Sequence, residues 1–397
     1  MGSFKINLDD YSLDQRVILL TLVAMYLPFY LSFLAMGLTM VYIFKNGKYK
    51  EILQSMATSK IIIIFSVYSF VVSLLAKNLG GLFKSFGIFA LLSFMLFVKQ
   101  NINKNLLKDL MNVIMIFSSA CFILTIGEYL IKFIRAENLS VFINFVTENR
   151  QSLGLMFLNV NYFSMIAAIS VLVSAYRYLI AKGSEKLISF FIGLLSLICL
   201  LMTESAASLA AAFIAIFVLT ILLKKYRYTG LMAGVLILGG GLVFVAKKIF
   251  GINLLSSLST DVGLRFSIWV SSIEGFKQNF IFGRGPGGLS NIYYLIRDRR
   301  IAHSHNIYLN FLLSFGLVGL ILIGPFVYEL FTEIRKQTDK KFFKLVLCLI
   351  ILVLLAGIFD ASITWVQTGL LFLSIIGGFA GLTDKNYKGQ SQSLVGK

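Results

Sequence analysis

Proline, cysteine, histidine and acidic residues are all scarce in this chain. Its 397 residues include three prolines, three cysteines, two histidines and 18 acidic residues, and only 14% are charged. Few prolines leave little room for extended linkers, and Cys121, Cys199 and Cys348 lie inside apolar runs, which suits buried packing better than disulfides or metal ligands. The whole chain is 58% hydrophobic with a mean hydropathy of +0.86, which is typical of an all-α polytopic membrane protein.

Apolar runs long enough to cross a hydrocarbon core of roughly 30 Å recur along the chain. The first block, residues 17–44, is long for one helix and short for two, and Pro28 near its middle predicts a kink or break. It has no small-residue cleavage site, so we interpret it as a retained membrane segment. The other predicted spans are residues 61–76, 82–98, 110–131, 162–179, 187–202, 207–223, 229–246, 307–330, 345–359 and 369–382.

Lysine and arginine cluster in alternate loops between these runs, as they do in cytoplasmic loops. Much of the net charge of +18 is explained in this way, without a nucleic-acid partner. If the N-terminus is internal, block 17–44 must cross twice, so we prefer about twelve helices with both termini inside. Eleven helices with an external N-terminus is the alternative. The whole chain, 1–397, is then one integral membrane domain with external loops at 132–159 and 247–305.

The larger loop departs from the charge pattern because it is basic although it is placed outside. Such a loop suits an anionic partner near the outer membrane surface, and contact with lipid headgroups or plain solvation is the alternative. The apolar residues Phe266, Trp269, Val270, Ile273, Phe276 and Phe280 recur at three- and four-residue spacing, which predicts one helix face. That helix would lie on the membrane or cap the bundle, with Arg265 near its start directed toward a bound anion.

Two further motifs close this loop. The run Phe282–Gly288 holds four glycines, whose backbone N–H groups can cradle a phosphate, although a plain turn between helices is the alternative. The chain's only histidines, His303 and His305, precede a helix that Ser304 or Asn306 would cap. Because histidine titrates near neutral pH, both are candidates for proton transfer. No paired carboxylates or histidine–carboxylate spacing appears outside, so we expect neither a metal ligand set nor a cofactor.

These motifs together resemble the signature of the bacterial O-antigen ligase and polymerase family. The matching elements, in order, are Arg150-x3-Gly154, Asn159-Val160-Asn161, Arg265-x3-Trp269, Phe282-Gly283-Arg284-Gly285, His303-Ser304-His305-Asn306 and Phe315-Gly316-Leu317-Val318-Gly319. Two departures stand out. Thr203-Glu204-Ser205-Ala206 lacks the arginine that many relatives carry there, and Asn279 takes the region where relatives often have proline.

The resemblance implies a C-type glycosyltransferase architecture that uses an undecaprenyl-diphosphate-linked oligosaccharide at the outer face of the cytoplasmic membrane. It implies His305 as the base, with His303 in reserve, and Arg265, Arg284 and Arg150 on the diphosphate. Asn306, Asn161, Glu204 and Asp360 are candidates for orienting a sugar, or for pairing with an arginine. Chain-length regulators and flippases are possible partner proteins in addition to the bilayer.

Three functions fit this sequence. A polymerase would join lipid-linked repeat units into capsule, O-antigen or exopolysaccharide, by inverting transfer without a metal. A ligase would move the finished glycan to another acceptor, and the motifs hardly separate the two. A lipid-linked oligosaccharide transporter is disfavoured, because we find neither a carboxylate at a span centre nor an internal repeat.

Overall fold

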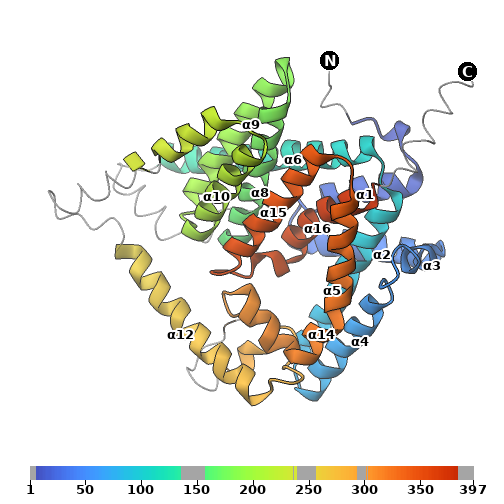
Figure 1. Ribbon diagram of the computed structural model, residues 1–397. Coiled ribbons are helices and arrows are strands. Elements are labelled where there is room, and N and C mark those ends of the chain that lie inside the picture. Colours follow the sequence, from blue (N-terminus) through green and yellow to red (C-terminus); the bar gives the residue numbers. More distant parts are fainter. Residues whose placement is uncertain are drawn as a thin grey trace, which may run out of the picture.

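The computed structural model describes residues 6–135, 157–235, 237–238, 256–292, 301 and 303–382, and these residues form helices and turns without a strand. Figure 1 shows the arrangement of the helices. In chain order they are η1 Leu8–Asp10, α1 Leu13–Ala24, α2 Phe29–Lys45, α3 Lys48–Leu53, α4 Ile61–Leu75, α5 Leu79–Asn101, α6 Lys104–Arg135, α8 Val160–Ile180, α9 Gly183–Met202, α10 Ala206–Leu222, α12 Ser256–Gln278, α14 Ile307–Lys336, α15 Lys340–Ala356, η3 Ser362–Thr364 and α16 Val366–Gly381.

The predicted spans coincide with helices to within a few residues at most ends. Among the described residues, α5, α6, α8, α9 and α14 are long and apolar enough to cross a membrane, and α2, α4, α10 and α16 are shorter apolar helices. The chain is therefore an all-helical, multi-pass membrane protein. The predicted span 229–246 is described only as far as residue 238, where it is helical.

Pro28 divides the first apolar block into two helices, as predicted. The helix α1 ends at Ala24, and Pro28 is the N-cap of α2. The Ser32 hydroxyl donates to the carbonyl oxygens of Ala24 and Leu27, at 2.9 and 3.2 Å. Buried carbonyls at the break are thus satisfied inside the protein, as the interior of a membrane requires.

The two ends of the bundle differ in their contacts. At one end the lysine-bearing loops meet, with Lys48 on Asp14 at 3.0 Å, Lys108 near Glu185 at 3.7 Å and the Lys99 ammonium on the Ser55 carbonyl at 2.9 Å. At the other end the Gln367 amide donates to the carbonyl oxygens of Met25 and Leu27, both at 2.9 Å. The Asn78 amide there donates to Pro286. The loops that alternate in charge therefore gather at opposite ends.

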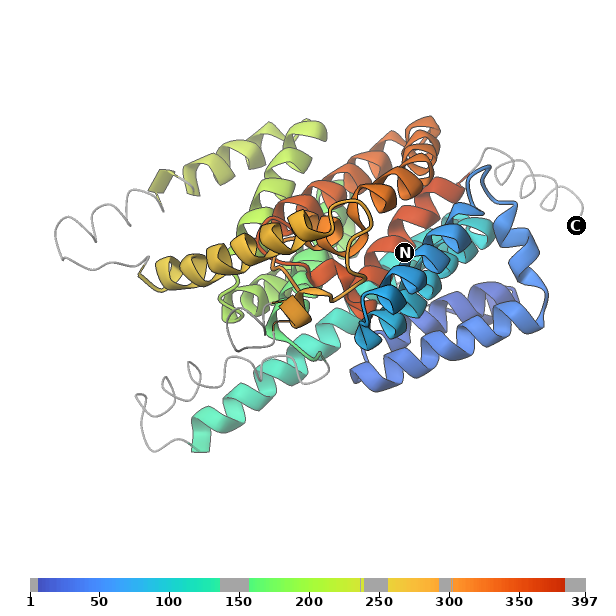
Figure 2. The ribbon, with the colours of Figure 1, turned by 90° about the horizontal axis from the view of Figure 1, so that it is seen from below.

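The predicted helix of the basic loop exists as α12, and of its two predicted placements the apolar face does not take the one against the bundle. The residues of α12 that are buried include Ile268, Ser271, Ser272 and Gly275, whereas Phe266 is 63% exposed. Small residues let two helices approach closely, which explains why the side of α12 that carries serine and glycine is buried. In Figure 1 α12 runs along the lower left edge, and Figure 2 shows it from below, crossing in front of other helices. Because the apolar side chains of α12 are exposed, contact with lipid is the placement that still fits the helix.

The helix α14 is not the single continuous span that was predicted. Gly316 interrupts it with a φ of 60° and a ψ of −164°. The freed groups find partners in the preceding turn, because Leu317 and Val318 donate to the carbonyl oxygens of Phe280 and Ile281 at 2.9 and 3.0 Å. A short first segment of α14 thus lies at the end of the bundle, directly after the histidines.

Candidate active site

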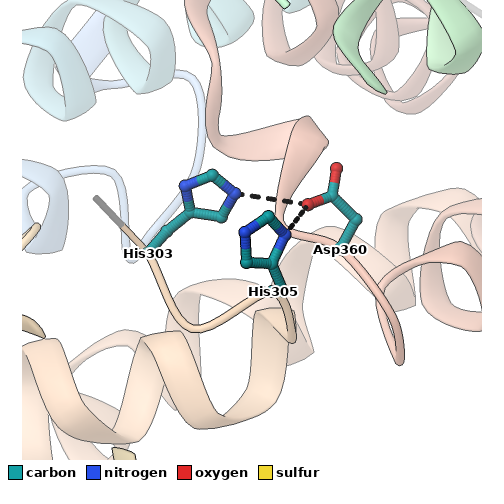
Figure 3. Close-up of side chains that lie close together, drawn as sticks. All are labelled: His303, His305 and Asp360. Atoms are coloured by element: carbon teal, nitrogen blue, oxygen red, sulfur yellow. Dashed lines mark hydrogen bonds and ion pairs between the residues drawn. The ribbon is translucent and has the colours of Figure 1, made fainter. Parts of the chain in front are cut away.

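Both histidines contact a single carboxylate that lies 55 residues beyond His305 in the chain. His303 Nε2 lies 3.2 Å and His305 Nδ1 lies 3.0 Å from the same oxygen, Asp360 Oδ1. The two imidazole centroids are 4.4 Å apart (Figure 3). Asp360 follows α15 and is buried, whereas the side chains of His303 and His305 are 16% and 23% exposed. The cluster is therefore anchored in the protein and reachable from one side.

Charge state and hydrogen bonding together fix which ring nitrogens carry protons. Burial alone would raise the pKa of Asp360, but the hydrogen bonds from His303 and His305, and the attraction of either imidazole when it is protonated, outweigh burial and hold that pKa well below its usual range. An ionised carboxylate has no proton to donate, so both ring nitrogens facing it donate. In the neutral rings, His305 Nε2 and His303 Nδ1 are then unprotonated and can accept a proton.

The second carboxylate oxygen is held as well. The Ser362 hydroxyl, at the start of η3, donates to Asp360 Oδ2, and the same hydroxyl lies 3.2 Å from the Asn161 carbonyl. The Thr368 hydroxyl in turn donates to the Ser362 carbonyl. These contacts tie the Asp360 loop to the starts of α8 and α16, so the carboxylate has little freedom to turn away from the histidines.

The histidine segment is bound to the Asp360 segment by its backbone and its helix cap. Asn306 is the N-cap of α14, since its side chain accepts from the Leu309 N–H at 2.9 Å and donates to the Ile358 carbonyl at 2.9 Å. The Ile307 N–H donates to the Gly357 carbonyl at 2.7 Å. Asn306, not Ser304, is therefore the cap, and its role in the structure is to join the two segments.

His305 has a backbone conformation that non-glycine residues seldom adopt. Its φ is 45°, in the left-handed region. The Trp269 indole N–H donates to the His305 carbonyl at 3.2 Å, and the Trp269 ring packs on Phe359 with centroids 5.8 Å apart. Trp269 is thus a packing anchor, and through it α12 holds His305 in its strained backbone conformation.

Arg265 lies beside the cluster, also on α12. Its guanidinium donates to the Phe359 carbonyl, one residue before Asp360. The planar guanidinium has five N–H donors, so donors remain for an anion at this position. The expectation that Arg265 faces the site from the helix agrees with this placement.

The glycine turn packs against the protein's own backbone and is not free to cradle a phosphate. The N–H groups of Arg284 and Gly285 donate to the carbonyl oxygens of Leu313 and Ser314, at 2.9 and 2.8 Å, and that of Gly283 donates to Asn279. A Cβ at Gly283 would lie 2.5 Å from the Ser314 oxygen. Of the two interpretations of this motif, the structural turn is therefore the one that the geometry favours.

Arg284 is not brought to the histidines. Its guanidinium donates to Gln278 Oε1 at 2.6 Å and approaches the Gly275 carbonyl at 3.4 Å, at the far end of α12. Arg265 lies ten residues before Gly275 on the same helix. At 1.5 Å per residue, these two positions are about 15 Å apart along the helix axis. One diphosphate clamped by both guanidinium groups, as the sequence suggested, does not fit this arrangement.

The remaining predicted residues have different positions. Asn161 reaches the cluster through its carbonyl, which accepts from Ser362. Glu204 is exposed in the turn between α9 and α10, with a φ of 50°. Arg150 lies outside the described residues.

The arrangement also corrects the expectation that no histidine–carboxylate group forms at this end. One ligand atom from each of His303, His305 and Asp360 lies within 4.8 Å of the others, a set able to hold a metal ion. Sequence spacing could not show this, because the acid is far away in the chain. Asp360 was considered only as a partner of a sugar or an arginine, and Ser362 was missed.

One comparison with known proteins is informative. Residues 191–324 match the family model described as O-antigen ligase, and no curated protein matches the chain. The matched stretch holds both histidines, Arg265 and the glycine turn, and Asp360 lies beyond its end. Residues 191–324 are therefore similar to the O-antigen ligase family, in agreement with the resemblance of the motifs.

Proposed function

We propose that the protein is a glycosyltransferase that polymerises undecaprenyl-diphosphate-linked oligosaccharide repeat units into surface polysaccharide at the outer face of the cytoplasmic membrane. The observation that carries this proposal is the histidine pair. It lies in the segment that matches O-antigen ligases, and it is held on one buried carboxylate at the end of the bundle opposite the lysine-rich loops. By the distribution of loop charge, that end faces outside. A C-type glycosyltransferase architecture with about twelve helices belongs to the same proposal.

The chemistry follows from the ring nitrogens. His305 Nε2 takes the proton from the acceptor hydroxyl as its oxygen attacks the anomeric carbon. The bond between that carbon and the diphosphate breaks, and undecaprenyl diphosphate leaves with the electron pair. Asp360 keeps the Nδ1 proton in place and stabilises the imidazolium that forms. A single displacement of this kind inverts the anomeric carbon.

A glycosyl diphosphate already has a good leaving group, so the site needs a cation more than a nucleophile. Arg265, beside the Asp360 loop, suits the developing charge, because a guanidinium can bond two phosphate oxygens at once. We keep Arg150 as a second candidate and assign Arg284 to the turn that holds α12. The transfer itself is proposed to need no divalent metal.

A ligase would use the same donor and the same base with a different acceptor. The description of the matched family supports this alternative directly. The two functions differ in what enters the acceptor side of the site, a second lipid-linked repeat unit or a separate carrier molecule.

The test is to incubate purified protein with a lipid-linked repeat unit and to separate the products on a gel. A ladder of lipid-linked chains supports the polymerase. Transfer only after another carrier is added supports the ligase instead. Movement of intact substrate across vesicle membranes, without any new glycosidic bond, would contradict both.

A further inference from the structure

The three side chains of the histidine cluster have the spacing of a metal-binding set. In a tetrahedral zinc site with bonds of 2.0–2.1 Å, neighbouring ligand atoms lie about 3.3 Å apart. The two nitrogen–oxygen distances to Asp360 Oδ1 are 3.2 and 3.0 Å, and all three ligand atoms fall within 4.8 Å (Figure 3). An ion could therefore replace the two shared protons once the two imidazole nitrogens, which lie within 4.8 Å of each other, close toward that spacing.

The type of donor selects the type of ion. Two imidazoles and one carboxylate suit a transition-metal ion, whereas magnesium and calcium prefer oxygen ligands alone. We propose that His303 Nε2, His305 Nδ1 and Asp360 bind one divalent ion of the zinc type, with water completing its coordination. The partial exposure of both imidazoles leaves a route for the ion to enter.

The surroundings already hold these ligands in place. The hydrogen bonds from Asn306 to Ile358 and from Ile307 to Gly357 join the two ligand-bearing segments. Ser362 donates to the carboxylate oxygen that faces away from the histidines, as the outer partners of metal ligands usually do. Binding therefore requires little new ordering of the chain.

Occupation of this site would stop the proposed transfer, a consequence that rests on the proposed function although the binding itself does not. A metal on His305 Nδ1 displaces the proton from that nitrogen. The neutral ring then carries its one proton on Nε2, the atom that must be unprotonated to act as the base. The ion is thus an inhibitor and not a cofactor, because the same nitrogens serve either the proton transfer or the metal.

The chain is well suited to a direct binding test, because its only two histidines are both in the cluster. The full-length protein, purified in detergent with a tag that lacks histidine, would be titrated with zinc chloride in a calorimeter and with cobalt chloride in an absorption cell. His303→Asn, His305→Asn and Asp360→Asn would be compared with the wild type. Glu333→Gln, on the lysine-bearing end of α14, is the matched carboxylate control.

We expect one ion per chain in the wild type and in Glu333→Gln. Each cluster variant should bind zinc about tenfold more weakly or worse. Loss of an outer hydrogen-bond partner already costs about this much affinity, and loss of a direct ligand should cost at least as much. Gel filtration identifies variants that fail to fold, and any one folded cluster variant suffices for the comparison. No saturable binding in the wild type, or equal affinity in the folded cluster variants, would overturn the site.

The inhibitory consequence is measured separately. Zinc should lower glycosyl transfer in step with occupancy, and a chelator should restore it. Full transfer at saturating zinc would overturn the inhibition while the binding result stands. A protein that transfers no sugar under any condition would refute the proposed function without touching the metal site.

Discussion

His305 and His303 share one acceptor oxygen but differ in their backbones. His305 alone of the two has a left-handed φ, and its carbonyl is held by Trp269. A strained residue that its surroundings hold in place is a reason to propose function. His305→Ala should therefore cut transfer by about two to four orders of magnitude, the usual share of a general base. The measurement is single-turnover transfer with the protein in excess over the lipid-linked donor.

Donor binding serves as the control for this substitution. The arginines are proposed to hold the diphosphate, so His305→Ala should bind donor as the wild type does. His303→Ala should lose less transfer than His305→Ala. If the two losses are reversed, His303 is the base. Near wild-type transfer in both variants would leave the pair as a structural clamp.

In the proposed transfer, Asp360 acts through the histidines and is a positioning residue. Asp360→Asn keeps the shape of the side chain but loses the charge, and its amide is a donor as well as an acceptor. The histidine tautomers are then no longer fixed. We expect kcat to fall by about a hundredfold with little change in KM. Steady-state kinetics separates the two constants, and a loss confined to KM would place Asp360 in substrate binding.

The composition of the site was only partly predictable from sequence. The histidines stood out because the chain has no others, and Arg265 stood out because it precedes a tryptophan in a basic loop. Asp360 was a candidate from its position, although not as the partner of the histidines. It follows a predicted span whose end faces the same side as the histidines, and acids are rare in this chain. Ser362 gives no comparable signal, since serine is common in helix-joining turns.

At the scale of elements, Gly316 permits the break in α14 that no hydropathy pattern reveals. Its φ and ψ fall in a region essentially restricted to glycine, and an added Cβ would lie 2.3 Å from the Ile281 carbonyl oxygen. Gly316→Ala should therefore destabilise the protein by about 2 kcal/mol or more, from strain of 1–3 kcal/mol and the steric overlap. Thermal unfolding in detergent measures the effect as a lower Tm.

Gly37, inside the helix α2, is the control. A Cβ there meets nothing within 4 Å. Gly37→Ala should leave Tm unchanged or raise it slightly, since alanine favours helix over glycine by up to about 1 kcal/mol. Equal Tm values for the two variants would mean that the turn at Phe280–Gly285 does not hold the break.

The helix α12 shows where pattern reasoning succeeds and where it leaves a choice open. Three- and four-residue spacing correctly predicted a helix in the basic loop. The spacing left open whether the apolar face would lie on the membrane or cap the bundle, and most of that face is exposed, as lipid around a membrane protein allows. Ser271, Ser272 and Gly275 then form the closer contact.

For the whole molecule, the helices could be predicted because a membrane demands long uninterrupted apolar runs, and their ends follow from the charges that stop them. How these helices pack is decided by contacts that no single run records, such as the buried hydrogen bonds between Ser170 and Ser196, at 2.9 Å, and between Arg177 and Asn112, at 2.7 Å. Packing of this kind brings the histidine segment and the Asp360 loop together at one end of the bundle, where they form the site.

The direction of the molecule in the membrane remains a prediction, and the mechanism depends on it. The three native cysteines are buried, so the labelling of an introduced cysteine can be measured without first replacing the native ones. Lys277→Cys in α12 and Ser290→Cys after the glycine turn should react with an impermeant thiol reagent in intact cells. Gln54→Cys, exposed between α3 and α4 at the lysine-rich end, should react only after the membrane is permeabilised. The opposite pattern would turn the histidines toward the cytoplasm, away from the face where the lipid-linked repeat unit is proposed to meet them.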